Sequence, residues 1–271
     1  MELRGKNAIV TGAARGIGRG IALKLGQAGS NLALIDLGDT RDPALTYSLA
    51  HQTELAETVE AVKKLGVKAV PILADVTKFA DCERMVRETA EKLGSVDILV
   101  NNAGVIAMGP VVEFSEAAWD RILAVNAKGA FLCAKASIPH LQKNREAAIV
   151  NIASIAGKRG YANLSAYCAS KFAVIALTQA LAQELGPSNI RVNAVCPGFL
   201  KTAMWTGVLN KAIAQQMEIR ESEVFEIYAA QNAWLGREQT PADIGDAVVY
   251  LASADNVTGV ALNVAGGAEV H

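Results

Sequence analysis

Short apolar runs alternate along the chain with longer segments in which apolar residues recur at helical spacing. Each run is bounded by Gly, Asp or Asn and has the length of a buried strand. Strands are predicted at residues 8–11, 31–36, 68–73, 98–101, 149–152, 191–195 and 261–264. The segments between these runs are expected to carry the helices.

A strand followed by a helix, repeated this often, predicts right-handed crossovers and therefore a parallel sheet of about seven strands with helices on both faces. No stretch rich in Pro, Gly, Ser or charge divides the chain, so residues 1–271 are expected to form one doubly wound α/β domain. Ligands of such sheets bind outside the carboxyl ends of the strands. Residues with binding or catalytic chemistry are therefore expected directly after each apolar run.

The composition fits this architecture and bears on the partner. Apolar residues make up 51% of the chain, aromatics only 5%, and 23 residues are glycine, as expected when β-branched strands are covered by Ala-rich helices. The 26 basic and 27 acidic residues nearly cancel and form no basic cluster, which argues against nucleic acid or an anionic membrane as partner. A small-molecule partner is favoured.

Cysteine usage and the N-terminal segment bear on the compartment. Cys82, Cys133, Cys168 and Cys196 are scattered, with no CxxC pair and no spacing to His that is typical of a metal site. Reduced thiols in a cytoplasm are expected. The first residues contain no apolar signal core, and the chain has no apolar run of about 18 residues, the length of a membrane span. The sequence predicts a soluble, cytoplasmic protein without a bound metal.

The first predicted strand leads into a glycine-rich loop. The loop reads Thr-Gly-Ala-Ala-Arg-Gly-Ile-Gly over residues 11–18, and a helix with an apolar face follows. Glycines at such a turn let the backbone approach a pyrophosphate, and the helix N-terminus offers free N–H groups to it. Because a strand precedes the loop and a helix follows it, a dinucleotide site is predicted, formed by Gly12, Arg15, Gly16, Ile17 and Gly18.

Two residues bear on which dinucleotide binds. Asp36 ends the second predicted strand, where its carboxylate can accept both ribose hydroxyls of an adenosine and would repel a 2′-phosphate. Arg15 could instead meet such a phosphate, or it could extend into solvent at the start of the helix. The solvated interpretation of Arg15 is preferred, so the sequence predicts NAD rather than NADP.

Polar residues also follow the third and fourth predicted strands. Asp75 could accept a hydrogen bond from an adenine amino group, or it could cap the helix that begins near Lys78, and spacing alone favours neither. The fourth run leads into Asn101, Asn102, Ala103 and Gly104. This turn is either a plain loop or a place where the backbone approaches a ligand closely.

Tyr167 and Lys171 are four residues apart in a predicted helix and therefore share one face. A free tyrosine has a pKa of about 10, and a neighbouring ammonium lowers that pKa, which suits a general acid or base. Ser154 lies at the carboxyl end of the fifth predicted strand. Asn126 lies in an apolar helical stretch, where its amide must find buried hydrogen-bond partners. A functional role for Asn126 is favoured over a packing role.

Together these features resemble the short-chain dehydrogenase/reductase superfamily over nearly the whole chain. The resemblance is carried by residues 11–18, residues 101–104, Asn126, Ser154, Tyr167, Lys171 and the pair Pro197-Gly198, in this order. It implies a Rossmann fold and an oxidoreductase that uses a nicotinamide dinucleotide.

The resemblance also implies roles for the matched residues. Ser154 and Tyr167 would hydrogen-bond the substrate oxygen, and Tyr167 would take or give the hydroxyl proton. Lys171 would bind the nicotinamide ribose and lower the tyrosine pKa, while Asn126 would hold a water that links Lys171 to solvent. Further cofactor contacts would come from Asp75, Val76, Asn102, Ala103, Gly104, Pro197, Gly198 and Thr202. A homotetramer is implied as well, with residues 115–144 and 166–185 between subunits.

Two segments depart from the family's common pattern. Residues 38–52, which follow the second predicted strand, resemble an insert of carveol-dehydrogenase-like members that folds over the adenosine end and holds NAD tightly; a solvated loop is the alternative. Residues 203–234, the lid segment, resemble the substrate lid of polyol and secondary-alcohol dehydrogenases, and a packed helical pair or subunit contact is the alternative. A mostly apolar substrate cleft is expected from Val105, Ile106, Met108, Met204 and Trp205, with polar contacts from Tyr161 and Asn163.

Three functions compete for this sequence. The leading hypothesis is an NAD-dependent dehydrogenase of a secondary alcohol or polyol, or a reductase of the matching ketone. The alternative is an NADPH-dependent 3-oxoacyl carrier-protein reductase, which Arg15 favours and Asp36 disfavours. A dinucleotide-sensing or scaffold protein on the same fold is the third hypothesis, but it would have no need of Ser154, Tyr167 and Lys171 in register.

Overall fold

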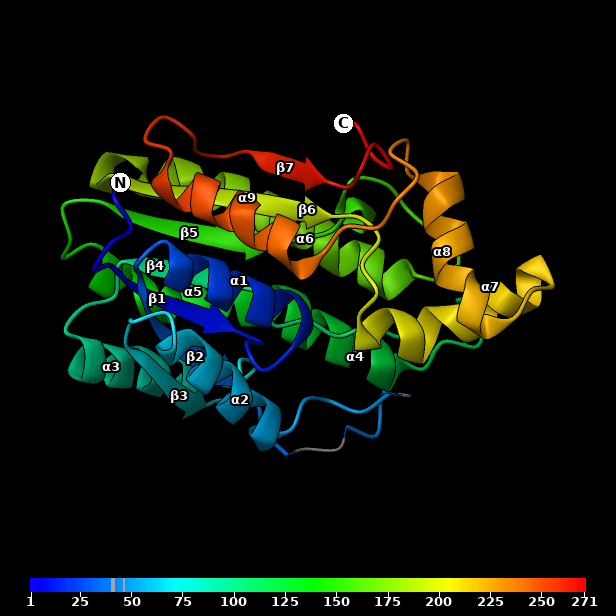
Figure 1. Ribbon diagram of the computed structural model, residues 1–271, viewed down its shortest axis with the longest axis horizontal. Coiled ribbons are helices and arrows are strands. Elements are labelled where there is room, and N and C mark those ends of the chain that lie inside the picture. The colour runs from blue at the N-terminus through cyan, green and yellow to red at the C-terminus, as the bar shows by residue number, and fades with distance from the viewer. Residues whose placement is uncertain (40–41, 46) are drawn as a thin grey trace.

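The computed structural model of the chain describes residues 1–39, 42–45 and 47–271, except for the side chains of residues 212 and 216. Within these residues one parallel sheet has the strand order β3-β2-β1-β4-β5-β6-β7 (Figure 1). The strands are β1 (Asn7–Thr11), β2 (Asn31–Asp36), β3 (Ala69–Leu73), β4 (Ile98–Asn101), β5 (Ala147–Ile152), β6 (Ile190–Pro197) and β7 (Ala261–Val264). The predicted doubly wound sheet is confirmed, and every predicted strand lies within two residues of its observed bounds.

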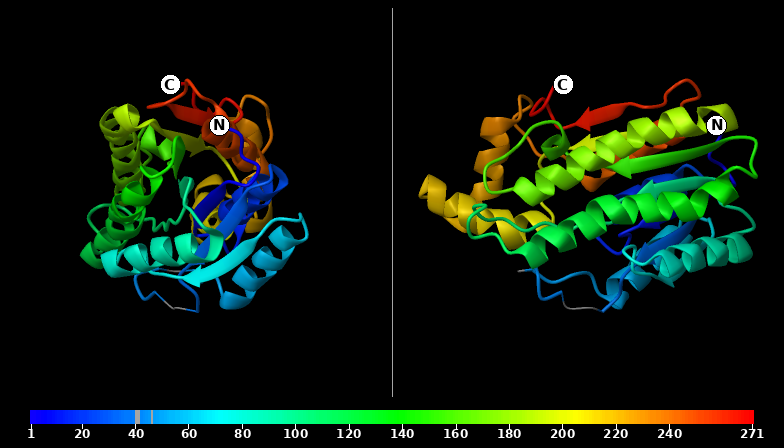
Figure 2. Two further views of the ribbon diagram at one scale, coloured as in Figure 1. Left: turned by 90° about the vertical axis from the view of Figure 1, so that its left-hand side faces the viewer. Right: turned by 180° about the vertical axis from the view of Figure 1, so that it is seen from behind.

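Helices cover both faces of this sheet (Figures 1 and 2). The longer helices are α1 (Gly16–Gln27), α2 (Gln52–Lys63), α3 (Phe79–Leu93), α4 (Glu116–Leu123), α5 (Gly129–Leu141), α6 (Ser165–Leu185), α7 (Asn210–Met217), α8 (Glu221–Asn232) and α9 (Pro241–Ser253). Two π-helices, η1 (Ala124–Lys128) and η4 (Trp205–Leu209), and two 3-10 turns, η2 (Ile155–Gly157) and η3 (Gly186–Ser188), complete the described elements. Among the described residues, no helix is both long and apolar enough to cross a membrane.

Two apolar cores sandwich the sheet because successive strand residues point to opposite faces. In β1, Ile9 faces the core formed with α3, α4, α5 and α6. Its neighbours Ala8 and Val10 face the core formed with α1, α2 and α9. A strand buried on both faces needs an unbroken apolar run, which is the pattern that the sequence displays.

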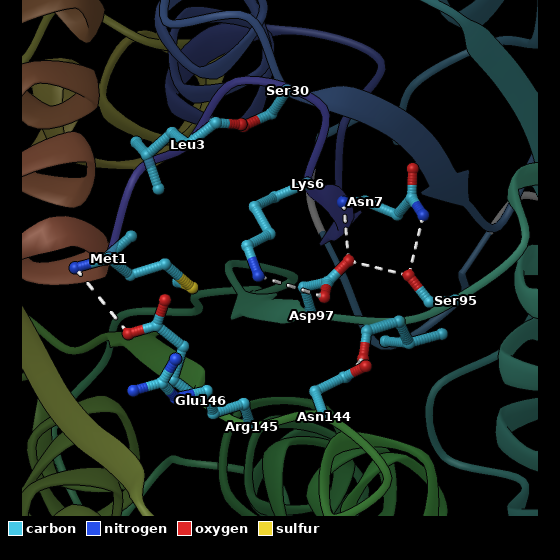
Figure 3. A network of polar contacts seen from close by, with 12 residues as sticks. Met1, Leu3, Lys6, Asn7, Ser30, Ser95, Asp97, Asn144, Arg145 and Glu146 are labelled. Carbon is cyan, nitrogen blue, oxygen red and sulfur yellow. Dashed lines mark hydrogen bonds and ion pairs between the residues drawn. The ribbon is translucent and has the colours of Figure 1, made fainter.

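A polar network fixes the amino ends of β1 and β4 (Figure 3). Asp97 accepts hydrogen bonds from the Asn7 N–H at 2.9 Å and from the Ser95 hydroxyl at 2.8 Å. The Lys6 ammonium lies 3.7 Å from the same carboxylate. The Asn7 side chain donates in turn to Ser95. This network holds the two central strands in register at the edge opposite to the expected ligand site.

The lid segment lies beyond the carboxyl ends of the strands, where α7 and α8 project from the sheet (Figure 1). It shares an apolar cluster with the loops after β5, β6 and β7, in which Trp205 packs edge-on against Phe199 and Phe225 at centroid distances of 5.7 and 5.1 Å. The segment is therefore a folded helical unit that covers the carboxyl edge.

Candidate active site

A cavity of about 560 Å³ opens at the carboxyl ends of the strands, a size typical of small-molecule and cofactor sites. Its walls come from the loops after β1, β2, β3, β4, β5 and β6 and from the lid segment. The predicted site residues that line it are Gly12, Arg15, Gly16, Ile17, Gly18, Asp36, Asp75, Val76, Asn102, Ala103, Gly104, Ser154, Tyr167, Lys171, Pro197, Gly198 and Thr202. Asn126 is the predicted residue that lies behind this wall.

The glycine loop after β1 is packed so closely that side chains would not fit. A Cβ on Gly12 would lie 2.9 Å from the Cα of Ala103, and one on Gly18 would lie 2.0 Å from the carbonyl oxygen of Gly12. The Asn102 amide donates to the carbonyls of Thr11 and Gly12 and so fixes the loop from the side of β4. Helix α1 begins at Gly16 with its free N–H groups at the cavity. A pyrophosphate fits this cradle.

Asp36 is held at the end of β2 by the backbone. Its carboxylate accepts the N–H groups of Ala14 at 3.0 Å and Leu37 at 2.9 Å. Burial raises the pKa of Asp36, and these two hydrogen bonds and the nearby Arg15 oppose that rise. Each carboxylate oxygen accepts one N–H and has a second lone pair, and Asp36 lines the cavity, so the group can still accept a ribose hydroxyl.

The Arg15 side chain is directed to partners in other segments. Its guanidinium donates to the Ser48 carbonyl in residues 38–52, the β2 insert, at 2.5 Å and lies 3.7 Å from the Glu54 carboxylate. The carboxylate partly neutralises the cation, and the carbonyl occupies one of its donors. The expectation of a solvated Arg15 side chain is therefore corrected, because the insert provides partners that the local sequence does not reveal.

Asp75 closes a turn ahead of α3. Its carboxylate accepts from the backbone N–H and the hydroxyl of Thr77, at 3.0 and 2.7 Å. The residue at the N-cap position of α3 is Lys78, so of the two alternatives for Asp75 the helix cap does not hold. Asp75 and Val76 both line the cavity, and the adenine contact stays a prediction.

Asn126 lies within the π-helix η1, between α4 and α5. The side chain is only 2% exposed, and its amide is fully engaged. It accepts from the Val105 N–H at 2.8 Å and donates to the Val105 carbonyl at 2.9 Å and to the Ser170 hydroxyl at 3.0 Å. Asn126 thereby holds the loop after β4 against α6. π-Helices of this kind often occur at functional sites.

Ser154, Tyr167 and Lys171 converge at one end of the cavity. Ser154 follows β5, and its hydroxyl accepts from the Ala156 N–H at 3.1 Å. Tyr167 and Lys171 lie one turn apart near the start of α6, with the Lys171 ammonium 5.6 Å from the centre of the Tyr167 ring. The ammonium donates to the Ile152 carbonyl at 2.9 Å. β5 and α6 therefore bring the three predicted side chains together.

Desolvation shifts the pKa values of this group. The half-buried Tyr167 side chain lines the cavity, and desolvation raises the pKa of Tyr167 to about 12, although its hydrogen bond with Ser154 works in the opposite direction. Burial also lowers the pKa of Lys171 to about 8. The Lys171 ammonium donates to the Ile152 carbonyl, and the lowering of the tyrosine pKa by Lys171 stays a prediction. At neutral pH the phenol is a proton donor.

Among the residues that line the cavity without having been predicted as site residues, three are aromatic. Tyr47 comes from the β2 insert, Phe199 follows β6, and Tyr228 comes from α8. Phe199 directly follows Pro197-Gly198 at a strand's carboxyl end, which is a usable signal. Phe225 and Tyr228 share one helix face at i,i+3 spacing, whereas nothing local to Tyr47 indicates that it reaches the cavity.

Comparison with known sequences agrees with this site. The short chain dehydrogenase family matches residues 6–212. L-2,3-butanediol dehydrogenase from Corynebacterium glutamicum is 38% identical, covering 97% of this chain and 98% of its own length. The 3-oxoacyl-(acyl-carrier-protein) reductase FabG from Staphylococcus epidermidis is 36% identical over the same shares of the two chains.

Solved structures give the same result. Carveol dehydrogenase from Mycobacterium avium in complex with NAD superposes with a TM-score of 0.92 at 33% identity, covering 98% of each chain. NAD+-bound xylitol dehydrogenase superposes with a TM-score of 0.86 at 31% identity, covering 98% of this chain and 100% of its own. The chain therefore belongs to the short-chain dehydrogenase/reductase superfamily, with alcohol and polyol dehydrogenases among its relatives.

Proposed function

We propose that this protein is an NAD-dependent dehydrogenase that oxidises a secondary alcohol or polyol, or reduces the matching ketone. One observation carries the proposal: Ser154, Tyr167 and Lys171 line the same cavity as a glycine loop that fits a pyrophosphate. A proton-transfer group and a dinucleotide cradle in one cavity are what hydride transfer to or from a carbonyl carbon requires.

The protein's part in the reaction is to orient the substrate and move a proton. A bound nicotinamide would supply the hydride chemistry. Tyr167 and Ser154 hydrogen-bond the substrate oxygen, and Tyr167 gives its phenolic proton to that oxygen during reduction or accepts the hydroxyl proton during oxidation. Lys171 lies one helical turn away and presents its ammonium to the ribose hydroxyls. Asn126 keeps the loop after β4 in place through its hydrogen bonds to Val105.

The cavity walls support a small, uncharged substrate. The loop after β4 provides Ile106 and Met108, and the lid segment provides Met204, Leu209 and Ile213. Polar groups near the substrate end are Tyr161 and Asn163. Such a mixture suits a ligand with one reacting oxygen and an apolar body. The relatives named for butanediol, carveol and xylitol support an alcohol or polyol of modest size.

A reductase of carrier-bound 3-oxoacyl groups is the second candidate, since relatives with that name are 36% identical. Arg15 carried this alternative because it could bind the 2′-phosphate of NADPH. Its guanidinium is directed to Ser48 and Glu54 instead. Asp36, which would repel the phosphate, lines the cavity. The direction of Arg15 and the position of Asp36 therefore favour the NAD-dependent alcohol dehydrogenase over the NADPH-dependent reductase.

A substrate panel tests the proposal. Secondary alcohols, polyols and hydroxy acids are incubated with the protein and NAD, and NADH formation is followed by absorbance. Turnover of at least one secondary alcohol or polyol, with no turnover of hydroxy acids, is expected. Reduction of 3-oxoacyl carrier protein by NADPH, at a kcat/KM above that of every alcohol with NAD, would instead establish the second candidate.

The cofactor preference is expected to depend on Asp36. The buried carboxylate and a 2′-phosphate would meet as like charges, at a cost of a few kcal/mol, so kcat/KM should favour NAD over NADP by about 10²-fold or more. Asp36→Asn retains an acceptor for the Ala14 N–H but removes the charge. It should reduce the ratio of kcat/KM for NAD to kcat/KM for NADP at least about tenfold. Equal kcat/KM values in the unaltered protein would contradict this assignment.

The lid segment is proposed to close over the cofactor and substrate. Its helices pack on one another, with Trp205 against Phe225 at a centroid distance of 5.1 Å, and closure would exclude water from the hydride step. Hydrogen exchange in residues 203–234 is expected to slow at least severalfold when NAD and an unreactive substrate analogue are added. Equal protection with and without these ligands would favour a fixed helical pair.

A further inference from the structure

One end of the β2 insert lies away from the adenosine end of the cavity. Asp36, Asp75 and Val76 mark the adenosine end. Tyr47, in contrast, accepts a hydrogen bond from the Ile106 N–H at 3.2 Å, and Ile106 belongs to the loop beside the catalytic group. A Cβ on Gly104, two residues earlier in this loop, would lie 3.6 Å from the Lys171 ammonium.

Tyr47 also contacts the lid segment. A Cβ on Gly207, in the π-helix η4, would lie only 2.8 Å from the Cβ of Tyr47. The tyrosine therefore packs directly on the helix backbone, at a position where a larger residue would displace it. Tyr47 thus stands between the loop after β4 and the lid segment, and it lines the cavity that Ser154 and Tyr167 also line.

The electrostatic contact between the two tyrosines agrees with this position. A charge on Tyr47 would raise the pKa of Tyr167, an effect that requires the phenols to be near each other because charge effects decline with distance. The Tyr47 oxygen accepts from Ile106, which leaves its own proton available to a ligand in the cavity.

Neighbouring residues of the insert hold Tyr47 in place. Asp42, whose side chain is 9% exposed, forms an ion pair with Arg121 of α4 at 2.5 Å. The Ser48 carbonyl accepts from Arg15. Leu45 and Leu49 pack against the core formed with α3, α4, α5 and α6. A side chain fastened on both sides in this way can limit the shape of a ligand, whereas a solvated loop could not.

We infer that Tyr47 is a specificity-determining residue of the substrate site: its ring forms the wall between Ile106 and the lid segment and limits the size of the larger substituent on the substrate's carbinol carbon. This inference rests on the proposed alcohol dehydrogenase function. It assigns part of the substrate site to the insert that follows the cofactor-binding strand. It also explains why Gly207 in the lid segment has no side chain at its point of contact with Tyr47.

The test compares a small and a bulky alcohol, 2-butanol and 1-cyclohexylethanol, in three variants. Tyr47→Ala removes the wall, and the ratio of kcat/KM for the bulky over the small alcohol should rise at least about tenfold, in the range by which pocket size alters selectivity. Tyr47→Phe keeps the ring but not the hydrogen bond to Ile106, so both alcohols should lose a similar factor of about three to ten. Tyr250→Ala is the matched control, since Tyr250 is 54% exposed on α9 and does not line the cavity, and it should leave the ratio unchanged.

Binding of NAD, measured by titration calorimetry, separates the substrate role from cofactor retention. The dissociation constant of NAD should change by less than about threefold in Tyr47→Ala. An unchanged alcohol ratio in Tyr47→Ala, an equal change in Tyr250→Ala, or a loss of NAD affinity that accounts for the whole loss of kcat/KM would overturn the inference. If the unaltered protein oxidises no alcohol or polyol of the substrate panel, the proposed function fails. If the two test alcohols are not oxidised, the affinities of the NADH complexes for 2-butanone and cyclohexyl methyl ketone are compared across the same variants instead, and the same change in their ratio is expected.

Discussion

Replacing Tyr167 by phenylalanine should reduce turnover by about 10² to 10⁴-fold, the usual contribution of a general acid or base. The substitution keeps the ring and its contact with Lys171 and deletes the proton that passes to or from the substrate oxygen. Phenylalanine loses only the hydrogen bond between the phenol and Ser154, so it should cost about 1 kcal/mol in folding. NAD affinity should therefore stay within about threefold of the unaltered protein, since the ring itself is kept.

The measurement is kcat with the best alcohol of the panel, together with the dissociation constant of NAD and a thermal unfolding curve. Tyr250→Phe is the matched control, since Tyr250 is 54% exposed on α9, far from the cavity wall. A Tyr167→Phe protein that binds NAD and turns over within about twofold of the unaltered protein would disprove the proposed mechanism, because acid–base catalysis is worth far more than that.

Replacing Lys171 by methionine should abolish most activity and yet stabilise the fold. The ammonium is 4% exposed, and burial lowers the pKa of Lys171 from 10.5 to about 8, which corresponds to about 3 kcal/mol of destabilisation when the lysine is charged. Losing the hydrogen bond to the Ile152 carbonyl costs about 1 kcal/mol. A net gain of about 2 kcal/mol in the free energy of unfolding at pH 7 is expected.

The sign of the pH dependence follows from the lowered pKa. Below about pH 8 the folded protein carries a buried charge that the unfolded chain hydrates freely, so the penalty is fully present. It declines as the pH rises from about 8 toward 10.5, where both states become neutral. The advantage of Lys171→Met in urea unfolding should thus shrink by about half or more between pH 7 and 9.5. The exposed control Lys143→Met should alter the free energy of unfolding neither at about pH 7 nor at about pH 9.5. A stabilisation by Lys171→Met that stays constant or grows with pH would show that the buried Lys171 charge is not its cause.

The sequence predicted the fold and most of the candidate site because their determinants are local. Apolar runs buried on both faces identify parallel strands, and each strand end places the next polar residue at one edge of the sheet. Asp36 and Ser154 follow from that rule, whereas Tyr167 follows from its i,i+4 spacing to Lys171 in a helix. The rule needs no knowledge of side-chain packing.

The features that were missed depend on contacts between distant segments. The Tyr167 pKa is set by how completely the cavity wall removes the phenol from water, which no spacing reveals. Arg15 is directed by a carbonyl in the β2 insert, and Tyr47 reaches the cavity from a segment that reads as a loop. Asn126 was recognised as a buried amide, but its place in a π-helix depends on the packing of Val105 and Ser170 against it.

The separate apolar cluster of the lid segment has an evolutionary consequence. Phe225 and Val224 are fully buried in a cluster distinct from the two cores that hold the sheet, so mutations in α7 and α8 need not disturb the strands that support the dinucleotide. Selection can therefore alter what the enzyme accepts while the older nucleotide-binding half persists. A lineage that diversifies its substrates is expected to accumulate changes in this helical unit faster than in β1 to β5. A comparison of substitution rates between the two parts measures that difference.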